Sequence, residues 1–396
     1  MLELKQKLDI QSKNYITVLE TIKSKHKQAR LIGGVVRDSM LGLKSHDVDI
    51  ATSMLPEEVT ELFTSLGAKV IPTGIQFGTV TLLYKGEAFE ITTLRKDLIC
   101  NGRHAHVEYT DDFYLDALRR DFTINALSYC PFEEIIYDYF EGARDLKKGL
   151  VKFIGEPDER IKEDYLRILR FFRFFGRFGR EIDQNSFDAC IRYKGFLKNL
   201  SRERIKSELD LILKLPNFVD ILLLMQEILP EILPVDERQC NGALTFPRAD
   251  DSGIRNDITL LSNNLKYALL FKESSITEAE LIALKFSRQE ARNICRFLVL
   301  TTAKITEYFL KKLWLENDNF TEFVIFLNII NGENAENSKL FLQLSGRQKP
   351  KFPVNGHDLT SMGITGPDVK QALTSLQKQW IESDFQLTQT ELLKLL

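Results

Sequence analysis

The chain has 396 residues, of which 44% are hydrophobic, so it is long enough for two to four domains with sizeable cores. Its formal net charge of −3 excludes a uniformly basic coat for nucleic acid but allows a local basic face. Five scattered cysteines without a Cys-x-x-Cys pair are typical of a reduced, intracellular protein and argue against a cysteine zinc site. The sequence shows no signal-peptide core and no run of about 18 apolar residues, so we expect a cytoplasmic protein without a membrane span.

The first predicted elements are a helix within residues 12–28 and then the stretch 31–50, LIGGVVRDSMLGLKSHDVDI. This stretch reads as strand, helix and strand, with Gly33 and Gly34 before its helix and Arg37 within it. Glycines before a helix let backbone N–H groups approach an anion, and an arginine can fork onto phosphate oxygens. These residues therefore predict a phosphate-binding turn.

The second strand of this stretch carries two acidic residues, Asp47 and Asp49. Residues two apart in a strand point to the same face, so these carboxylates project together. Adjacent carboxylates repel each other unless a hard cation lies between them. A glycine pair or an Asp-x-Asp alone is usually only a turn or a solvated strand edge, but their joint occurrence at this spacing predicts a phosphate site beside a divalent-metal site.

Residues 56–150 alternate between short helical and strand patterns, which predicts an α+β unit with a mostly antiparallel or mixed sheet. Glu90 lies inside an apolar strand pattern at residues 88–94, and it is either a third carboxylate near the metal or a solvent-facing glutamate on an edge strand. Residues 97–117 lack periodicity and predict a mobile loop over the site. The two histidines at 104 and 106 are too few for a zinc site.

A dense polar cluster follows at residues 119–126, RRDFTINA. Asp121 can cap the N-terminus of a helix that starts here. Arg119 and Arg120 would then lie beside that N-terminus, where phosphate also binds. The alternative is a capped helix with surface arginines.

From residue 158 onward helical periodicity dominates. One polar stripe follows three- and four-residue steps along a predicted helix and consists of Asp164, Arg167, Arg170, Arg173 and Arg177. Residues 165–206 contain eleven Lys or Arg and four Asp or Glu, an excess that suits an RNA backbone. The alternative is an ordinary solvated face.

Beyond residue 216 we expect helices at 217–229, 258–271, 277–300, 304–315 and 318–330. Residues 234–256 are loop-like and their role stays open. Glycines at 356, 363 and 366 precede a helix that begins near Asp368, and they indicate either a phosphate site or a tight turn between helices.

The stretch 31–50 resembles the signature of class II nucleotidyltransferases of the polymerase-beta superfamily, in particular tRNA CCA-adding enzymes and bacterial poly(A) polymerases. The similarity continues through RRDFTINA at 119–126, YDYFEGARDL at 137–146, EDYLR at 163–167 and SRERI at 201–205. By this resemblance Arg120 contacts the nucleotide, Asp164 and Arg167 read the incoming base, and residues 97–117 form a flexible loop needed for the last addition.

The resemblance also implies an architecture. It predicts an α+β, polymerase-beta-like nucleotidyltransferase head with a mixed sheet at residues 1–150, followed by an all-α neck, body and tail. The neck at 151–215 would select the nucleobase and bind RNA, the body would cover 216–300, and the tail at 301–396 would bind tRNA.

The implied activity is template-independent addition of CCA to the 3′ end of tRNA from CTP and ATP, with release of pyrophosphate by a two-metal mechanism. Asp47 and Asp49 would be the catalytic residues and Mg²⁺ ligands, with Glu90 as a further candidate. The predicted nucleotide-binding residues are Gly33, Gly34, Arg37, Arg120, Asp164, Arg167, Arg170 and Arg173. A poly(A) polymerase and an enzyme that adds only CC or only A remain alternatives, whereas the retained motifs argue against a non-catalytic RNA-binding protein. No protein partner and no oligomeric state can be inferred.

The proposed reading of the base rests on complementary hydrogen bonds. Cytosine and adenine both present an exocyclic amine, which donates, beside a ring nitrogen, which accepts. An ionised Asp164 only accepts and Arg167 only donates, so the pair fits either base. Uracil and guanine present the opposite order and would be rejected.

Overall fold

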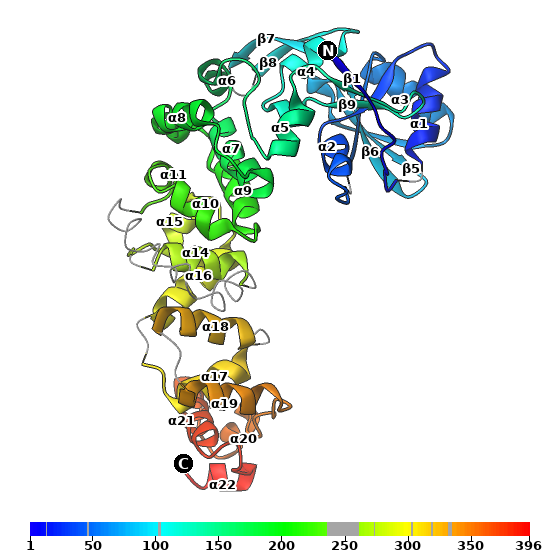
Figure 1. Ribbon diagram of the computed structural model, residues 1–396. Coiled ribbons are helices and arrows are strands. Elements are labelled where there is room, and N and C mark those ends of the chain that lie inside the picture. Colours follow the sequence, from blue (N-terminus) through cyan, green and yellow to red (C-terminus); the bar gives the residue numbers. More distant parts are fainter. Residues whose placement is uncertain are drawn as a thin grey trace. The chain divides into compact units, whose positions relative to one another are not determined.

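The computed structural model (Figure 1) describes residues 1–12, 14–45, 47–101, 104–235, 261–272, 274–301, 304–317, 320–331 and 335–396. The chain divides into two compact units, Met1–Pro234 and Val235–Leu396. Within the described residues, no helix combines the length and the apolar character needed to cross a membrane. The boundaries predicted for head, neck, body and tail stay a prediction.

The first unit is built on a mixed eight-stranded sheet, as predicted. Its strand order is β1-β10-β9-β2-β3-β6-β5-β4. The neighbours β3 and β6 run parallel, whereas the other neighbours pair antiparallel. The strands are β1 (Leu2–Lys5), β2 (Ala29–Ile32), β3 (Val48–Thr52), β4 (Lys69–Gly74), β5 (Thr79–Tyr84), β6 (Glu87–Thr93), β9 (Ser128–Cys130) and β10 (Ile135–Asp138).

Three helices follow the pattern of the sequence in this part of the chain: α1 (Tyr15–Lys23), α2 (Gly34–Met40) and α3 (Pro56–Ser65). The start of α3 is fixed locally, since proline is its first residue and the carboxylate of Glu58 accepts a hydrogen bond from the Leu55 N–H at 2.7 Å. Val18, Val35 and Val59, one from each helix, are fully buried in one core with the sheet. This core fixes the loops at the strand ends, where the polar residues of the site lie.

The loop predicted for residues 97–117 is wrong for its described part. β7 (Arg95–Asn101) and β8 (His104–Tyr109) form an antiparallel hairpin, and α4 (Phe113–Leu118) follows. The two strands pair with each other as a separate sheet. The prediction relied on alternation of apolar and polar residues, which marks a half-buried strand and not every paired strand. Residues 102 and 103, between the two strands, lie outside the described residues.

The rest of the first unit is helical, with α5 (Gly142–Lys148), α6 (Pro157–Glu163), α7 (Leu166–Phe178), α8 (Gln184–Arg192), α9 (Arg202–Leu213), α10 (Phe218–Leu224) and α11 (Leu229–Ile232). Buried aromatic rings on α7 join it to the head: Phe171 and Phe174 lie 6.3 and 5.5 Å from the ring of Phe122, between ring centroids. The helix predicted at residues 163–173 begins only at Leu166, because the backbone of Asp164 is extended with φ −157° and ψ 105°.

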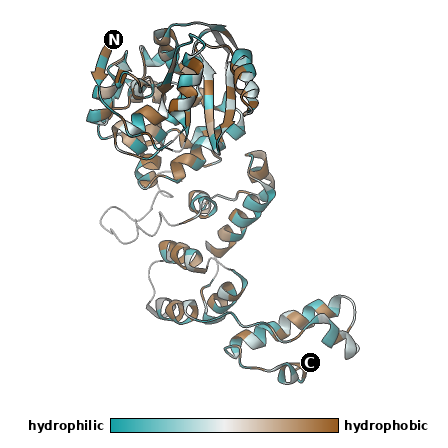
Figure 2. Ribbon diagram, turned by 90° about the vertical axis from the view of Figure 1, so that its right-hand side faces the viewer, coloured by the Kyte–Doolittle hydropathy of each residue, from teal (hydrophilic) through white to brown (hydrophobic). Residues whose placement is uncertain are grey.

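The second unit is helical throughout its described part. It contains α14 (Asn263–Leu270), α15 (Glu278–Ala283), α16 (Arg288–Thr301), α17 (Glu307–Glu316), α18 (Phe320–Asn331), α19 (Ala335–Ser345), α20 (Gly356–Ser361), α21 (Pro367–Glu382) and α22 (Gln389–Leu393). Hydrophilic and hydrophobic residues occupy different sides of many helices in both units (Figure 2). The loop-like segment predicted at 234–256 lies outside the described residues from position 236 on.

The glycine-rich segment near the end of the chain contains the predicted tight turn between two helices. Asn355 caps α20, because its side chain accepts hydrogen bonds from the N–H groups of His357 and Asp358. Gly366 precedes α21 with a φ of +62°, a conformation that favours glycine. The predicted phosphate site at this turn stays a prediction.

Candidate active site

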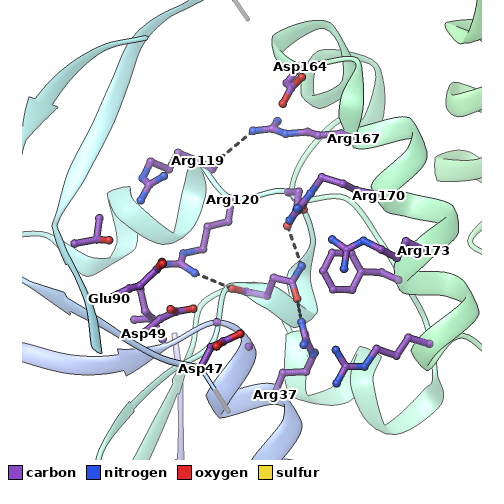
Figure 3. Close-up of a pocket in the computed structure, with 18 residues that line it drawn as sticks. Arg37, Asp47, Asp49, Glu90, Arg119, Arg120, Asp164, Arg167, Arg170 and Arg173 are labelled. Atoms are coloured by element: carbon purple, nitrogen blue, oxygen red, sulfur yellow. Dashed lines mark hydrogen bonds and ion pairs between the residues drawn. The ribbon is translucent and has the colours of Figure 1, made fainter. Parts of the chain in front are cut away.

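A polar pocket of about 660 Å³ lies in the first unit, and all the predicted site residues line it (Figure 3). Seven arginines and five acidic residues contribute to its wall. Asp49 and Glu90 come from the sheet and Asp47 from the position before β3, whereas Arg167, Arg170 and Arg173 face them from α7. The other lining residues are Ile32, Gly33, Gly34, Arg37, Thr92, Arg119, Arg120, Asp121, Asn125, Asp164, Phe174 and Arg177.

The acidic side of the pocket arises from the parallel pairing of β3 and β6. This register places Asp49 directly opposite Glu90, and β6 is not an edge strand because β5 covers its other side. Burial first, and the neighbouring Glu90 second, raise the pKa of Asp49 from 3.8 to about 6. Asp47 stands just before β3 and is exposed. Glu90 and Asp47 thus lie close enough to disfavour the ionisation of Asp49.

These oxygens suit a hard divalent cation. Within the described residues, no group of three or more Asp, Glu, His or Cys side chains is arranged as a metal cage. A cation on Asp47 and Asp49 would therefore take other ligands from water or from a nucleotide. Mg²⁺ is commonly bound in this way, by one or two carboxylates plus phosphate oxygens.

Gly33 joins β2 to α2 and is required by the backbone. Its φ is +64°, and a Cβ there would lie 3.0 Å from Nη1 of Arg120. Its N–H donates to the carbonyl oxygen of Leu127 at 3.0 Å, so this donor is used within the fold. The glycine pair therefore shapes the wall of the pocket beside Arg120.

Arg37 is buried, with 4% of its surface exposed. Its Nε donates to Asp38 at 2.8 Å, and its Nη1 donates to the side-chain oxygen of Asn125. Its guanidinium carbon also lies 4.4 Å from the ring centre of Phe178 on α7. Burial lowers the pKa of Arg37, while Asp38 opposes that change. Arg37 is a predicted phosphate ligand, but most of its N–H donors are thus used in hydrogen bonds within the protein.

Asp116 pairs with both Arg119 and Arg120 and fixes their positions. One oxygen of this buried carboxylate accepts from Arg119 at 2.9 Å, and the other accepts from Arg120 at 3.1 Å. Although burial alone would raise it, the two arginines hold the pKa of Asp116 below its usual range. The sequence contained a signal for this role, because an aspartate three and four residues before two arginines can reach both on one helix face.

The prediction that Asp121 caps a helix is wrong. One of its oxygens accepts from the Phe122 N–H and the Asn125 amide, and the other accepts from Nε of Arg170 at 2.7 Å. The following residues form only a 3-10 turn (Thr123–Asn125) before β9. A buried pair with an arginine 49 residues away takes the place of the local cap.

Each arginine on the predicted stripe of α7 is paired with a carboxylate. Arg170 contacts Asp121, Arg173 donates to Glu208 on α9 at 2.6 Å, and Arg177 contacts Asp38 at 2.9 Å. The fourth, Arg167, is paired with Glu163 at 2.6 Å. The stripe is therefore a set of fixed cations on the pocket wall and not a freely solvated face.

Asp164 lies two residues before α7 and Arg167 lies in its first turn, so the two are not on one continuous helix. Arg167 also donates to two backbone carbonyls, of Arg160 at 2.8 Å and of Arg119 at 3.1 Å. Asp164 accepts from the Leu166 N–H at 3.1 Å and from Arg204 at 2.7 Å. Both line the pocket, as predicted, but several local contacts set their positions.

Comparisons with known proteins agree with this arrangement. The family model of the poly A polymerase head domain matches residues 29–152. A protein of Danio rerio named CCA tRNA nucleotidyltransferase 1, mitochondrial, is 34% identical over 400 residues, which cover 96% of this chain and 90% of the relative. The chain belongs to the CCA tRNA nucleotidyltransferase family. Its human relative of the same name is also 34% identical and covers 94% of the chain and 87% of its own length.

Solved structures named as CCA-adding enzymes share the fold of the family member described here. The Bacillus stearothermophilus CCA-adding enzyme in complex with CTP aligns with a TM-score of 0.74 and 24% identity, over 94% of this chain and 93% of its own. A tRNA nucleotidyltransferase complexed with a primer tRNA and an incoming ATP analog aligns with a TM-score of 0.63 and 25% identity, over 83% and 95%. The predicted fold class, an α+β head followed by helices, is confirmed.

The sequence analysis did not identify two polar residues, Asn125 and Asp38, as parts of the site. Asn125 lies inside the RRDFTINA motif and bridges Asp121 and Arg37 through its side chain. Asp38 stands next to Arg37, but its contact with Arg177 spans 139 residues of sequence. A motif can direct attention to such residues, whereas only the fold reveals their partners.

Proposed function

We propose that the protein adds CCA to the 3′ end of tRNA without a nucleic-acid template, using CTP and ATP and releasing pyrophosphate. The observation that carries this proposal is the single pocket in which adjacent aspartates of the sheet face an arginine-lined helix. Membership in the CCA tRNA nucleotidyltransferase family supports it. The polypeptide would act mainly by positioning the reactants and neutralising charge.

Asp47 and Asp49 would hold Mg²⁺ in this pocket. Their hard oxygen atoms fit this ion, and a cation would offset the burial and the repulsion by Glu90 that raise the pKa of Asp49. Bound metal supplies activation of the 3′-hydroxyl and neutralisation of the triphosphate. Glu90, which lines the same wall, adds negative potential and is a further candidate ligand.

The arginines of the pocket would bind and orient the triphosphate. Arg120 stands beside Gly33 at the strand end, with Asp116 behind it. Arg170 and Arg173 project from α7 and are held by the carboxylates of Asp121 and of Glu208 on α9. Cations fixed in advance need no reorganisation when charge develops on the phosphates, which favours the transition state.

Asp164 and Arg167 would read the pairing edge of the incoming base. The carboxylate accepts from the exocyclic amine of cytosine or adenine, and the guanidinium donates to the ring nitrogen. Each mismatched contact with uracil or guanine costs about 1–3 kcal/mol. Arg204, which donates to Asp164 at 2.7 Å, keeps this carboxylate in place.

The test supplies tRNA without CCA and a poly(A) primer in parallel, offers each nucleoside triphosphate, and sequences the products. The proposal expects CCA on tRNA, with CTP used before ATP, and little extension of the poly(A) primer. Long A tails on either RNA would instead identify a poly(A) polymerase. Products that end after CC, or that need a CC end to start, would identify a split-function enzyme.

We also propose a cytoplasmic location and no membrane association. Relatives include proteins named as mitochondrial and proteins from bacteria such as Ligilactobacillus salivarius, 29% identical over 93% of the chain. Fractionation of cells with an antibody against the native protein would test the location directly.

A further inference from the structure

The strongest observation outside the catalytic residues is a closed circuit of hydrogen bonds between the head and α7. It begins at Arg170, which donates to Asp121 at 2.7 Å. Asp121 accepts from the amide of Asn125 at 3.0 Å, and the oxygen of that amide accepts from Arg37. Figure 3 shows Arg170 and Arg37 at the two ends of this part of the circuit.

Asp38 and Arg177 close the circuit. One oxygen of Asp38 accepts from Nε of Arg37 at 2.8 Å, and the other accepts from Nη2 of Arg177 at 2.9 Å. Arg177 lies on α7, seven residues after Arg170, so both ends of the circuit return to the same helix. Hydrogen bonds therefore connect the head to α7 at Arg170 and at Arg177, which lie about two turns apart.

The two partners of the Asp38–Arg177 ion pair differ in burial. The side chain of Asp38 is 5% exposed, whereas that of Arg177 is 41% exposed. Because the carboxylate is buried and shared by two guanidinium groups, it is a fixed point on the head. The more exposed Arg177 can be shortened without opening the core, which makes it the better place for a test.

We propose that Asp38 and Arg177 are positioning residues whose ion pair sets the orientation of α7 on the catalytic head. The other hydrogen bonds from α7 to the head, at Arg167 and Arg170, lie nearer the start of the helix, so loss of the Asp38–Arg177 pair frees its C-terminal end to tilt. Arg167, at the start of the same helix, is the predicted reader of the base, so a tilt would misalign base reading relative to the aspartates of β3. Small misplacements of this kind cost rate and selectivity steeply. The inference rests on the proposed function, because selectivity between nucleotides is its readout.

A competing role for Arg177 is direct binding of phosphate, since it lines the pocket. The two roles predict different effects when Arg177 or Asp38 is substituted. If Arg177 only neutralises phosphate, removing its charge weakens all nucleoside triphosphates equally, and removing the negative charge of Asp38 strengthens them. If the pair positions α7, Arg177→Ala and Asp38→Asn both lower selectivity, and the double variant is no worse than either single one.

The experiment measures kcat/KM for CTP and UTP on tRNA without CCA, for wild type, Arg177→Ala, Asp38→Asn, the double variant and Arg177→Lys. We expect CTP/UTP selectivity to fall roughly tenfold, equivalent to about 1.4 kcal/mol, in both single variants and in the double variant. Arg177→Lys, which keeps the charge, should recover part of it. Selectivity unchanged in both single variants, or losses that add in the double variant, would overturn the inference.

Arg192→Ala is the matched control. This arginine on α8 forms an ion pair with Asp158 on α6, and neither residue lines the pocket. Its selectivity should equal that of wild type, and thermal unfolding of every variant identifies any that fail to fold. If wild-type protein adds nothing to tRNA, the proposed function fails, while dissociation constants for CTP and UTP in the same variants still test the positioning role. A CTP/UTP binding ratio that is the same in wild type and variants would then overturn it.

Discussion

The carboxylate of Asp49 should destabilise the metal-free protein, and Asp49→Asn should relieve that cost while it abolishes activity. The side chain is partly buried on β3 and faces Glu90 on the neighbouring strand. Asparagine keeps its shape but carries no charge. The same substitution removes a proposed metal ligand, so stability and activity should change in opposite directions.

The size of the effect follows from the pKa. Burial and, second, Glu90 raise the pKa of Asp49 from 3.8 to about 6. One pKa unit corresponds to about 1.4 kcal/mol, so the ionised carboxylate costs the fold up to about 3 kcal/mol. Between pH 3.8 and 6 the folded protein binds more protons at this group than the unfolded chain does, so its contribution to stability falls as pH rises. The full cost is present above pH 6 and absent below pH 3.8.

The assay is urea unfolding with a chelator at pH 7 and pH 5, for wild type and Asp49→Asn. The variant should gain about 1–3 kcal/mol at pH 7 and less at pH 5. Glu90→Gln should gain a smaller amount, and Asp47→Asn, at an exposed position, the least. Added Mg²⁺ should stabilise wild type but not Asp49→Asn. An equal or lower free energy of unfolding for Asp49→Asn at pH 7 would refute the reasoning.

Three other measurements test the remaining parts of the structure. Asp116→Ala should raise KM for CTP and ATP alike by about tenfold, with selectivity kept, because Arg119 and Arg120 lose their shared support; unchanged KM would contradict this. Affinity for tRNA should fall steeply between low and moderate salt, and a flat log–log plot would exclude phosphate contacts. Gly142→Ala should cost more than about 2 kcal/mol of stability, because its Cβ would lie 2.1 Å from the carbonyl oxygen of Thr123. Gly195→Ala, with no atom within 4 Å of its Cβ, is the control, and equal stability of the two variants would contradict the close approach.

Local signals were sufficient for much of the head. The helix α3 and the strand β5 agree with the helical and strand patterns predicted from residue 56 on, since proline, first-turn acids and alternating apolar residues mark such elements. The candidate site was also predictable, because its motifs lie at the ends of such elements. The structure brings every predicted site residue to one pocket, although their chemical roles stay predictions.

Two of the errors, at Asp121 and Asp164, share one cause, which is contact between distant parts of the chain. Asp121 looks like a helix cap in sequence, but Arg170 and Asn125 take up its carboxylate. Periodicity runs without interruption past Asp164, yet its backbone is extended and its carboxylate meets Arg204 on another helix. Propensity and period describe a segment by itself, and they cannot show which remote charge will compete for it.

The arginine stripe on α7 shows how contacts between residues distant in sequence affect function. In sequence, basic residues outnumber acidic ones in the segment that contains α7, and this suggests a free surface for RNA. In the fold, acids from outside the helix approach the arginines: Asp38 from α2, Asp121 from the loop after α4, and Glu208 from α9. An arginine with a carboxylate on one side keeps further N–H donors for a phosphate on the other. The pairing lowers the net attraction for RNA in general, but it fixes where the remaining donors point. A protein that chooses its substrate without a template needs that fixed direction more than it needs extra charge.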